Sequence, residues 1–195
     1  MSPRIPERPR LRIVAHDDLT AEDVEDAALD LDWLLVGNWQ QTNEHPALTS
    51  FLDQSERTRI DYVEDAIAGF RYFDVVGRFA YDVERDIRAT FPTYSADKAL
   101  DALRTAPPDE RPGAVLLAAL GAGSSEHALV EALRSAAADE NPAVRRSVVL
   151  GVGYVGWPAL VELLAELNRT DPDPDVREDA ATMIQVLEEI ASGVT

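Results

Sequence analysis

Residues 140–164 have the sequence ENPAVRRSVVLGVGYVGWPALVELL, which carries the clearest structural signal in the chain. Within it, Gly151, Gly153 and Gly156 have the spacing G-x-G-x-x-G and follow an apolar run. This spacing is typical of dinucleotide-binding sites, in which a strand precedes the glycine turn, a helix follows it, and a second strand ends in an acid that binds the ribose. The stretch therefore poses a choice between a nucleotide site and a joint between two helices.

The prolines on either side of the glycines favour the helical joint. A proline is well tolerated at the first position of a helix, whereas inside a helix it costs about 3 kcal/mol. In a nucleotide site Pro158 would lie about one turn inside the helix, and no second strand follows, because the next segment is NRTDPDPDVRED. Pro142 and Pro158 instead stand where two successive helices would begin. We therefore expect the glycines to let helices approach closely and to turn the chain at Gly156.

The same pattern recurs along the C-terminal half of the chain. At a spacing of 32 residues, Pro142, Val144 and Arg145 are matched by Pro174, Val176 and Arg177. An upstream segment, RPGAVLLAALGAG, matches at a spacing of 30, although it has Gly113 and Ala114 where valine and arginine are expected. The first two copies are each followed by a second amphipathic stretch, so one period is a helical hairpin of about 30 residues.

The segments NPAVRR…LG…PALVELL and DPDPDVRED resemble the HEAT-like helical repeats of the PBS-lyase type. In that family an acidic turn with P-x-V-R opens the first helix, L-G closes it, and an A-L-x-x-L helix follows. The resemblance spans residues of about 96–191 and implies an α-solenoid, but it implies no reaction. Independently of the family, we expect Arg145 and Arg177 to pair with acids in the turns of their own or the preceding repeat.

The N-terminal half gives a weaker signal. Apolar spacings of three and four predict a helix over residues 21–37, a short helix over 46–54, and one or two helices over 56–89. The expected fold class is therefore all-α, a short α-solenoid of HEAT-like helical hairpins with an N-terminal helical cap.

Three regions are expected along the chain. A Pro/Arg-rich arm occupies residues 1–16, an acidic helical region occupies 17–94, and the HEAT-like repeats occupy 95–195. The sequence has no 18-residue apolar run and no signal-peptide pattern, which predicts a cytoplasmic protein without membrane contact. The oligomeric state is left open.

The charge of the chain excludes some classes of partner. Its 195 residues carry a net charge of −18 and include no cysteine. Nucleic acids and anionic membranes are bound through Lys and Arg, so this charge disfavours both and favours a basic protein or peptide. Eight of the acids lie between Asp17 and Asp32, and no Lys or Arg occurs from Ile13 to Glu56.

No pattern in the sequence predicts catalytic, cofactor-binding or metal-binding residues. The segment DPDPD at residues 171–175 imitates the start of a calcium-binding loop, but Val176 and Thr182 stand where that loop needs Gly and Glu. His16, His45 and His127 lie in three separate regions. We therefore expect no cofactor and no metal.

These features predict a non-enzymatic, protein-binding helical repeat scaffold for a basic partner, and in a narrower form an inhibitor or immunity protein. Tryptophan is a common interface anchor. The predicted partner-binding residues are accordingly six acids and two tryptophans: Glu22, Asp23, Glu25, Asp26, Asp30, Asp32, Trp39 and Trp157.

The alternative is a helical enzyme or small-molecule-binding protein with a site between the N-terminal helices and the repeats. HEAT-like relatives include chromophore lyases and alkylpurine DNA glycosylases. The glycosylase option is disfavoured, because it needs a basic groove and this chain is acidic.

Overall fold

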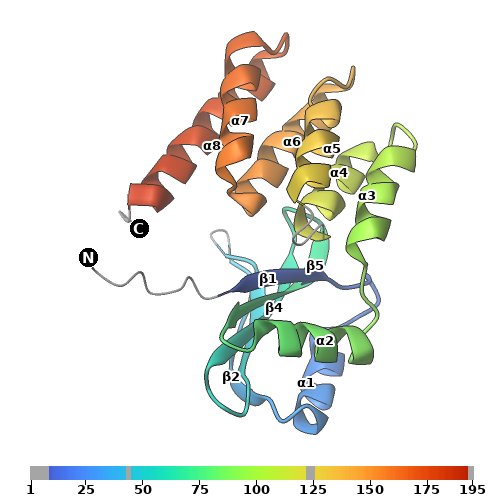
Figure 1. The fold of residues 1–195 in the computed structure, drawn as a ribbon, viewed down its shortest axis with the longest axis vertical. Coiled ribbons are helices and arrows are strands. Elements are labelled where there is room, and N and C mark those ends of the chain that lie inside the picture. The colour runs from blue at the N-terminus through green and yellow to red at the C-terminus, as the bar shows by residue number, and fades with distance from the viewer. Residues whose placement is uncertain (1–8, 43–44, 122–125, 193–195) are drawn as a thin grey trace. The chain divides into compact units, whose positions relative to one another are not determined.

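The computed structural model describes residues 9–42, 45–121 and 126–192. The chain divides into two compact units, Met1–Tyr94 and Ser95–Thr195. The first unit contains an antiparallel sheet with two helices, and the described residues of the second form stacked helices (Figure 1). Of the expected N-terminal arm, residues 1–8 lie outside the described residues, and the part that follows includes the first strand of the sheet.

The first unit has a five-stranded sheet in the order β1-β5-β4-β3-β2, with every neighbouring pair antiparallel. Both helices, α1 and α2, lie on the same side of this sheet (Figure 1). The elements are β1 (Arg10–Val14), α1 (Ala21–Asp30), β2 (Leu34–Trp39), β3 (Ala47–Leu52), β4 (Thr58–Asp65), β5 (Phe70–Gly77) and α2 (Ala80–Thr90).

The core of this unit forms between the two helices and the sheet face that they cover. Aromatic side chains dominate it: Trp33 packs against Phe51, Phe73 and Phe91, with ring centroids 5.9 to 6.5 Å apart. The buried Tyr62 hydroxyl donates a hydrogen bond of 2.7 Å to the carbonyl of Leu19, which satisfies its polar end inside the core.

The predicted all-α fold class is wrong, because residues 10–77 build this sheet and no helical cap exists in the described part of the first unit. The helix expected over 21–37 ends at Asp30. The N–H of Trp33 donates to the carbonyl of Ala28, and the N–H of Asp32 donates to the carbonyl of Leu29. These two bonds are the pattern of a Schellman motif. Asp32 takes the left-handed position (φ 56°) that glycine usually fills. The sequence therefore lacks the glycine that would have indicated the end of this helix.

The helices expected over 46–54 and 56–89 are also wrong, except that the last third of the longer one is α2. The misleading spacing has a physical cause, because β4 and β5 bury apolar residues on both faces. Ile60 and Phe73 belong to the helix-covered core, whereas Val63 and Val76 lie on the opposite face. A strand buried on both faces places apolar residues at odd as well as even intervals, which imitates helical spacing.

The second unit consists of helical hairpins arranged in two layers. Helix α6 packs between α4 and α8 in one layer, and α5 contacts α3 and α7 in the other (Figure 1). The helices are α3 (Ala96–Thr105), α4 (Arg111–Gly121), α5 (Glu126–Ala136), α6 (Pro142–Val155), α7 (Pro158–Thr170) and α8 (Pro174–Ser192). The expected stack of hairpins in this half is confirmed.

The glycines of the opening motif serve helix packing, as predicted. A Cβ added at Gly151 would lie 3.0 Å from the Cβ of Ala119 in α4, and one added at Gly153 would lie 2.5 Å from the Sδ of Met183 in α8. Gly156 ends α6 in the left-handed conformation, with φ 67°. Pro158 occupies the start of α7, where its missing N–H costs little.

Arginines link the turns of successive hairpins. The Arg145 guanidinium donates to both carboxylate oxygens of Asp171, at 2.7 and 2.9 Å, and the two side chains are only 8% and 1% exposed. The Nη1 group of Arg145 donates to the backbone carbonyls of Asp139 and Glu140. The expectation of an acid from its own or the preceding repeat is wrong for Arg145, because its carboxylate partner lies in the following turn.

The upstream repeat uses a different arginine for the same purpose. Arg111 donates to the Asp139 carboxylate at 2.8 Å and to the carbonyl of Ala106. Its place in the motif differs from that of Arg145, since it precedes a proline rather than following one by three residues. The missing V-R pair of this copy is thereby compensated.

We predict that Gly151→Leu lowers the free energy of unfolding by about 2 kcal/mol, because the new side chain would overpack the contact between α4 and α6. The matched control is Gly113→Leu in α4, where an added Cβ meets nothing within 4 Å. Because leucine is a better helix former than glycine, the control should be unchanged or more stable. Urea unfolding followed by circular dichroism compares the two variants, and equal stabilities would contradict the packing role of Gly151.

We also predict an acid-dependent contribution from the Arg145–Asp171 pair. Burial alone would raise the pKa of Asp171, but hydrogen bonds from Arg145 and from the N–H of Asp173 outweigh it and hold that pKa below its ordinary value. The pair therefore stabilises the fold above the unfolded-state pKa, near 3.9, and this stabilisation is lost as the pH falls through the lower folded-state pKa.

Asp171→Asn should lower the free energy of unfolding by about 3 kcal/mol at pH 7, since it leaves Arg145 without its carboxylate. The difference from the wild type should shrink as the pH falls from about 5 to 2. The control is Glu162→Gln, an exposed acid on the neighbouring α7. A difference that is independent of pH in urea titrations would rule out this electrostatic role.

Candidate functional site

The predicted partner-binding acids lie on or just after α1, which runs beside β2 (Figure 1). Glu22, Asp26, Asp30 and Asp32 are exposed to solvent. Glu25 is partly buried and accepts a hydrogen bond of 2.6 Å from the side-chain amide of Asn38 in β2. This bond joins the acidic helix to the strand at the edge of the sheet.

Two of the six acids have structural roles as well. Asp23 completes the N-terminal cap of α1, where it accepts hydrogen bonds from the hydroxyl and the N–H of Thr20, and these bonds lower its pKa. Asp32 supplies the left-handed residue that ends the helix. The acids whose charge is available to a partner are therefore chiefly the others.

The charge on α1 is not compensated by ion pairs. Among the residues that the structure describes, no ion pair involves an acid of α1, and each paired carboxylate lies at residue 61 or beyond. These carboxylates belong to Asp61, Glu64, Asp74, Asp82, Glu84, Asp86, Asp101, Glu131, Asp139, Asp171 and Asp179. Arginine thus pairs with several acids from residue 61 onward, whereas the closely spaced acids of α1 have no such partner among the described residues.

Apolar side chains are exposed on β2, beside this acidic helix. Leu34, Leu35, Val36 and Trp39 are each 51 to 55% exposed. The Trp39 ring lies close to Gly37 in the same strand, since a Cβ added at Gly37 would come within 2.9 Å of the ring. β2 is a terminal strand of the sheet, so the side chains of this apolar group flank a backbone edge that no other strand of the sheet covers.

We call the accessible acidic and apolar residues of α1, β2 and the turn between them the α1–β2 surface. Its members are Glu22, Glu25, Asp26, Leu29, Asp30, Asp32, Leu34, Leu35, Val36 and Trp39. Leu29 is 81% exposed and lies one helical turn after Glu25 on the same stripe of α1. Acidic and apolar groups therefore alternate over neighbouring positions of this surface.

Trp157, the remaining predicted contact residue, belongs to the second unit. It immediately precedes α7, is partly buried, and packs against the core of the repeats. This packing explains why an aromatic residue occurs here even if no other protein contacts it. A role of Trp157 in binding stays a prediction.

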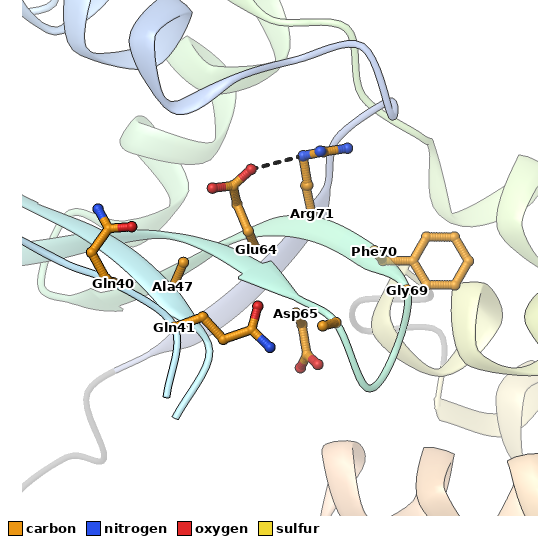
Figure 2. Close-up of a pocket in the computed structure, with 9 residues that line it drawn as sticks. Gln40, Gln41, Ala47, Glu64, Asp65, Gly69, Phe70 and Arg71 are labelled. Carbon is orange, nitrogen blue, oxygen red and sulfur yellow. Dashed lines mark hydrogen bonds and ion pairs between the residues drawn. The ribbon is translucent and has the colours of Figure 1, made fainter. Parts of the chain in front are cut away.

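A pocket of about 460 Å³ lies at one end of the sheet and is lined by residues of β3, β4, β5 and the segment after β2 (Figure 2). Glu64 and Arg71 form an ion pair of 3.0 Å on its wall. The Asp65 carboxylate accepts hydrogen bonds from the N–H groups of Ile67 and Ala68 in the β4–β5 turn. Both carboxylates are engaged, so the pocket offers hydrogen-bonding amides, from Gln40 and Gln41, rather than an activated acid or base.

A row of polar side chains crosses the sheet face opposite the helices, and sequence reasoning missed it. Ser50, Asp61, Asp74 and Arg12 are successive cross-strand partners. Ser50 donates to Asp61 at 2.6 Å, and Arg10 binds the Asp74 carboxylate through two nitrogens. Burial raises the pKa of Asp61. The available signal was a single Asp inside each of the apolar runs RIDYV and YFDVV.

Two negative findings apply to residues 9–42, 45–121 and 126–192. No group of three or more His, Cys, Asp or Glu side chains is arranged to hold a metal ion there. No helix in these ranges has the length and apolar character needed to cross a bilayer.

Comparison with known proteins gives one match. Residues 96–185 match the family model of HEAT repeats, whereas no curated protein and no solved structure matches the chain. The match coincides with the stacked hairpins α3 to α8, a helical scaffold of a kind that commonly binds proteins. Residues 96–185 therefore form HEAT-like repeats.

Proposed function

We propose that this protein is a non-enzymatic binding scaffold for a basic protein or peptide and that the α1–β2 surface is a principal contact site. The observation that carries the proposal is the dense charge of α1, which no described ion pair compensates, beside the exposed apolar side chains of β2. Like charges on one helix repel one another, so this arrangement lowers stability unless something else favours it. Contact with a basic partner provides that compensation.

The distribution of charge and apolar groups suits an interface. Dense charge of one sign steers a partner of the opposite sign and raises its association rate, whereas apolar and aromatic anchors slow dissociation. The acids of α1 supply the first property, and Leu34 and Trp39 supply the second.

A narrower proposal is that the protein is an inhibitor or immunity protein that neutralises a basic protein. Support for it comes from the net charge of −18 and the small size of the chain. The other function considered above, a small-molecule or catalytic site between the two halves, stays a prediction. Its N-terminal component would be the sheet unit rather than a set of helices.

The proposal predicts that neutralising α1 abolishes capture of basic proteins. The test variant is Glu22→Gln/Asp26→Asn/Asp30→Asn, and the control is Glu178→Gln/Glu188→Gln/Glu189→Gln, which makes the same change in net charge on exposed positions of α8. Immobilised full-length chains are exposed to cell extract at low and high salt, and the captured proteins are identified by mass spectrometry.

We expect the wild type and the α8 variant to capture the same basic protein at low salt and the α1 variant to lose it. With that protein purified, the association rate should fall by about tenfold or more in the α1 variant. If only acidic or neutral proteins are captured, or if both variants bind equally well, the α1–β2 surface is not a site for a basic partner.

A further inference from the structure

The two edges of the sheet are built differently. At β1, the exposed side chain of Arg10 carries a charge at the edge, and the N–H of Tyr94 bonds to the carbonyl of Val14 from outside the sheet. Charged side chains and such coverage are the usual protection of an edge strand. At β2, no charged residue occurs from Trp33 to Gln41, and no strand pairs with its outer side in the described sheet.

We propose that β2 accepts an additional strand from the partner, so that an extended basic segment joins the sheet beside α1. This proposal rests on the proposed function, since it specifies how the basic partner would bind to the same surface. Backbone hydrogen bonds to the free edge would provide affinity that is independent of side chains, and the surfaces on either side of β2 would select the sequence.

The pairing of β2 with β3 indicates which side chains an added strand would meet. Leu35 and Asn38 pair with Phe51 and Thr49 and share the face covered by α1. Leu34 and Trp39 pair with Leu52 and Leu48 and lie on the opposite face.

Side chains of a strand alternate between the two faces of a sheet. One set of an added strand's side chains would therefore lie beside Glu25 and the other acids of α1, and the other set would lie beside Leu34 and Trp39. The partner segment is thus inferred to alternate basic and apolar residues.

Charge distinguishes this occupant from a second copy of the chain. Pairing two β2 strands edge to edge would bring two α1 helices, each with uncompensated acids, to the same sheet, and like charges would oppose the association. The bulge at Val36, where the register with β3 shifts, also interrupts the ladder and increases the local twist. Both features favour a short basic segment over a continuous sheet of two copies.

The test uses the full chain and three short peptides of equal numbers of arginine and valine. In the first peptide the two residues alternate, in the second the arginines precede the valines, and the third has the alternating sequence with its central backbone amides N-methylated. Hydrogen–deuterium exchange with mass spectrometry locates each contact, and fluorescence titration measures each affinity.

We expect the alternating peptide to slow exchange in Leu34–Trp39 and to bind about tenfold or more tightly than the other two. Leu34→Lys/Trp39→Lys should weaken its binding by a similar factor. The control Ile67→Lys/Tyr81→Lys, which alters more exposed hydrophobic residues of the same unit, should not.

The inference is overturned if no peptide slows exchange in β2, or if the N-methylated peptide binds as well as the alternating one. If all three peptides bind equally and neutralising α1 weakens them all, charge alone mediates binding, so the proposed function survives and strand addition fails. Sedimentation showing a dimer that Leu34→Lys/Trp39→Lys dissociates would assign the edge to a second copy instead.

Discussion

The helical hairpins of the second unit cannot bury their apolar stripes alone, and this constraint determines most of what its sequence must contain. Each stripe needs a neighbouring hairpin, so the helices must approach closely and in a fixed order. Gly151 and Gly153 permit the approach on two sides of α6, and Arg145 joins its own turn to the next through Asp171. Packing and charge therefore specify the same arrangement of the stack.

This use of arginine in the repeats has a consequence for the rest of the chain. With 18 basic residues against 36 acids, arginines that hold turns and strands together leave few to neutralise other regions. The segment from Ile13 to Glu56 has none, and there the acids of α1 stand beside an apolar strand edge. Uncompensated charge and an unprotected edge are each unfavourable for an isolated protein, and their coincidence at one surface is the basis for proposing that a partner binds there.

The repeats were predictable because their signals are local. Proline at a helix start and glycine at a helix end act through the conformation of their own residues, and the period of about 30 residues repeats these signals. The sheet was not predictable in the same way. Asp32 ends α1 in a conformation that glycine usually supplies. On the face opposite the helices Val63 is buried and Val76 is partly buried, so the apolar pattern resembled a helix.

The amino-acid sequence alone determined the helical hairpins of residues 96–185, the role of the glycines and the acidic character of the N-terminal segment, since each depends on neighbouring residues or on composition. Only the tertiary structure showed that Trp39 lies on an edge strand beside α1, that Arg145 reaches the following turn, and that Asp61 and Asp74 share one buried row. These facts depend on which strands and turns meet in space. Strand order and register are set by contacts between residues far apart in the chain, which local spacing does not record.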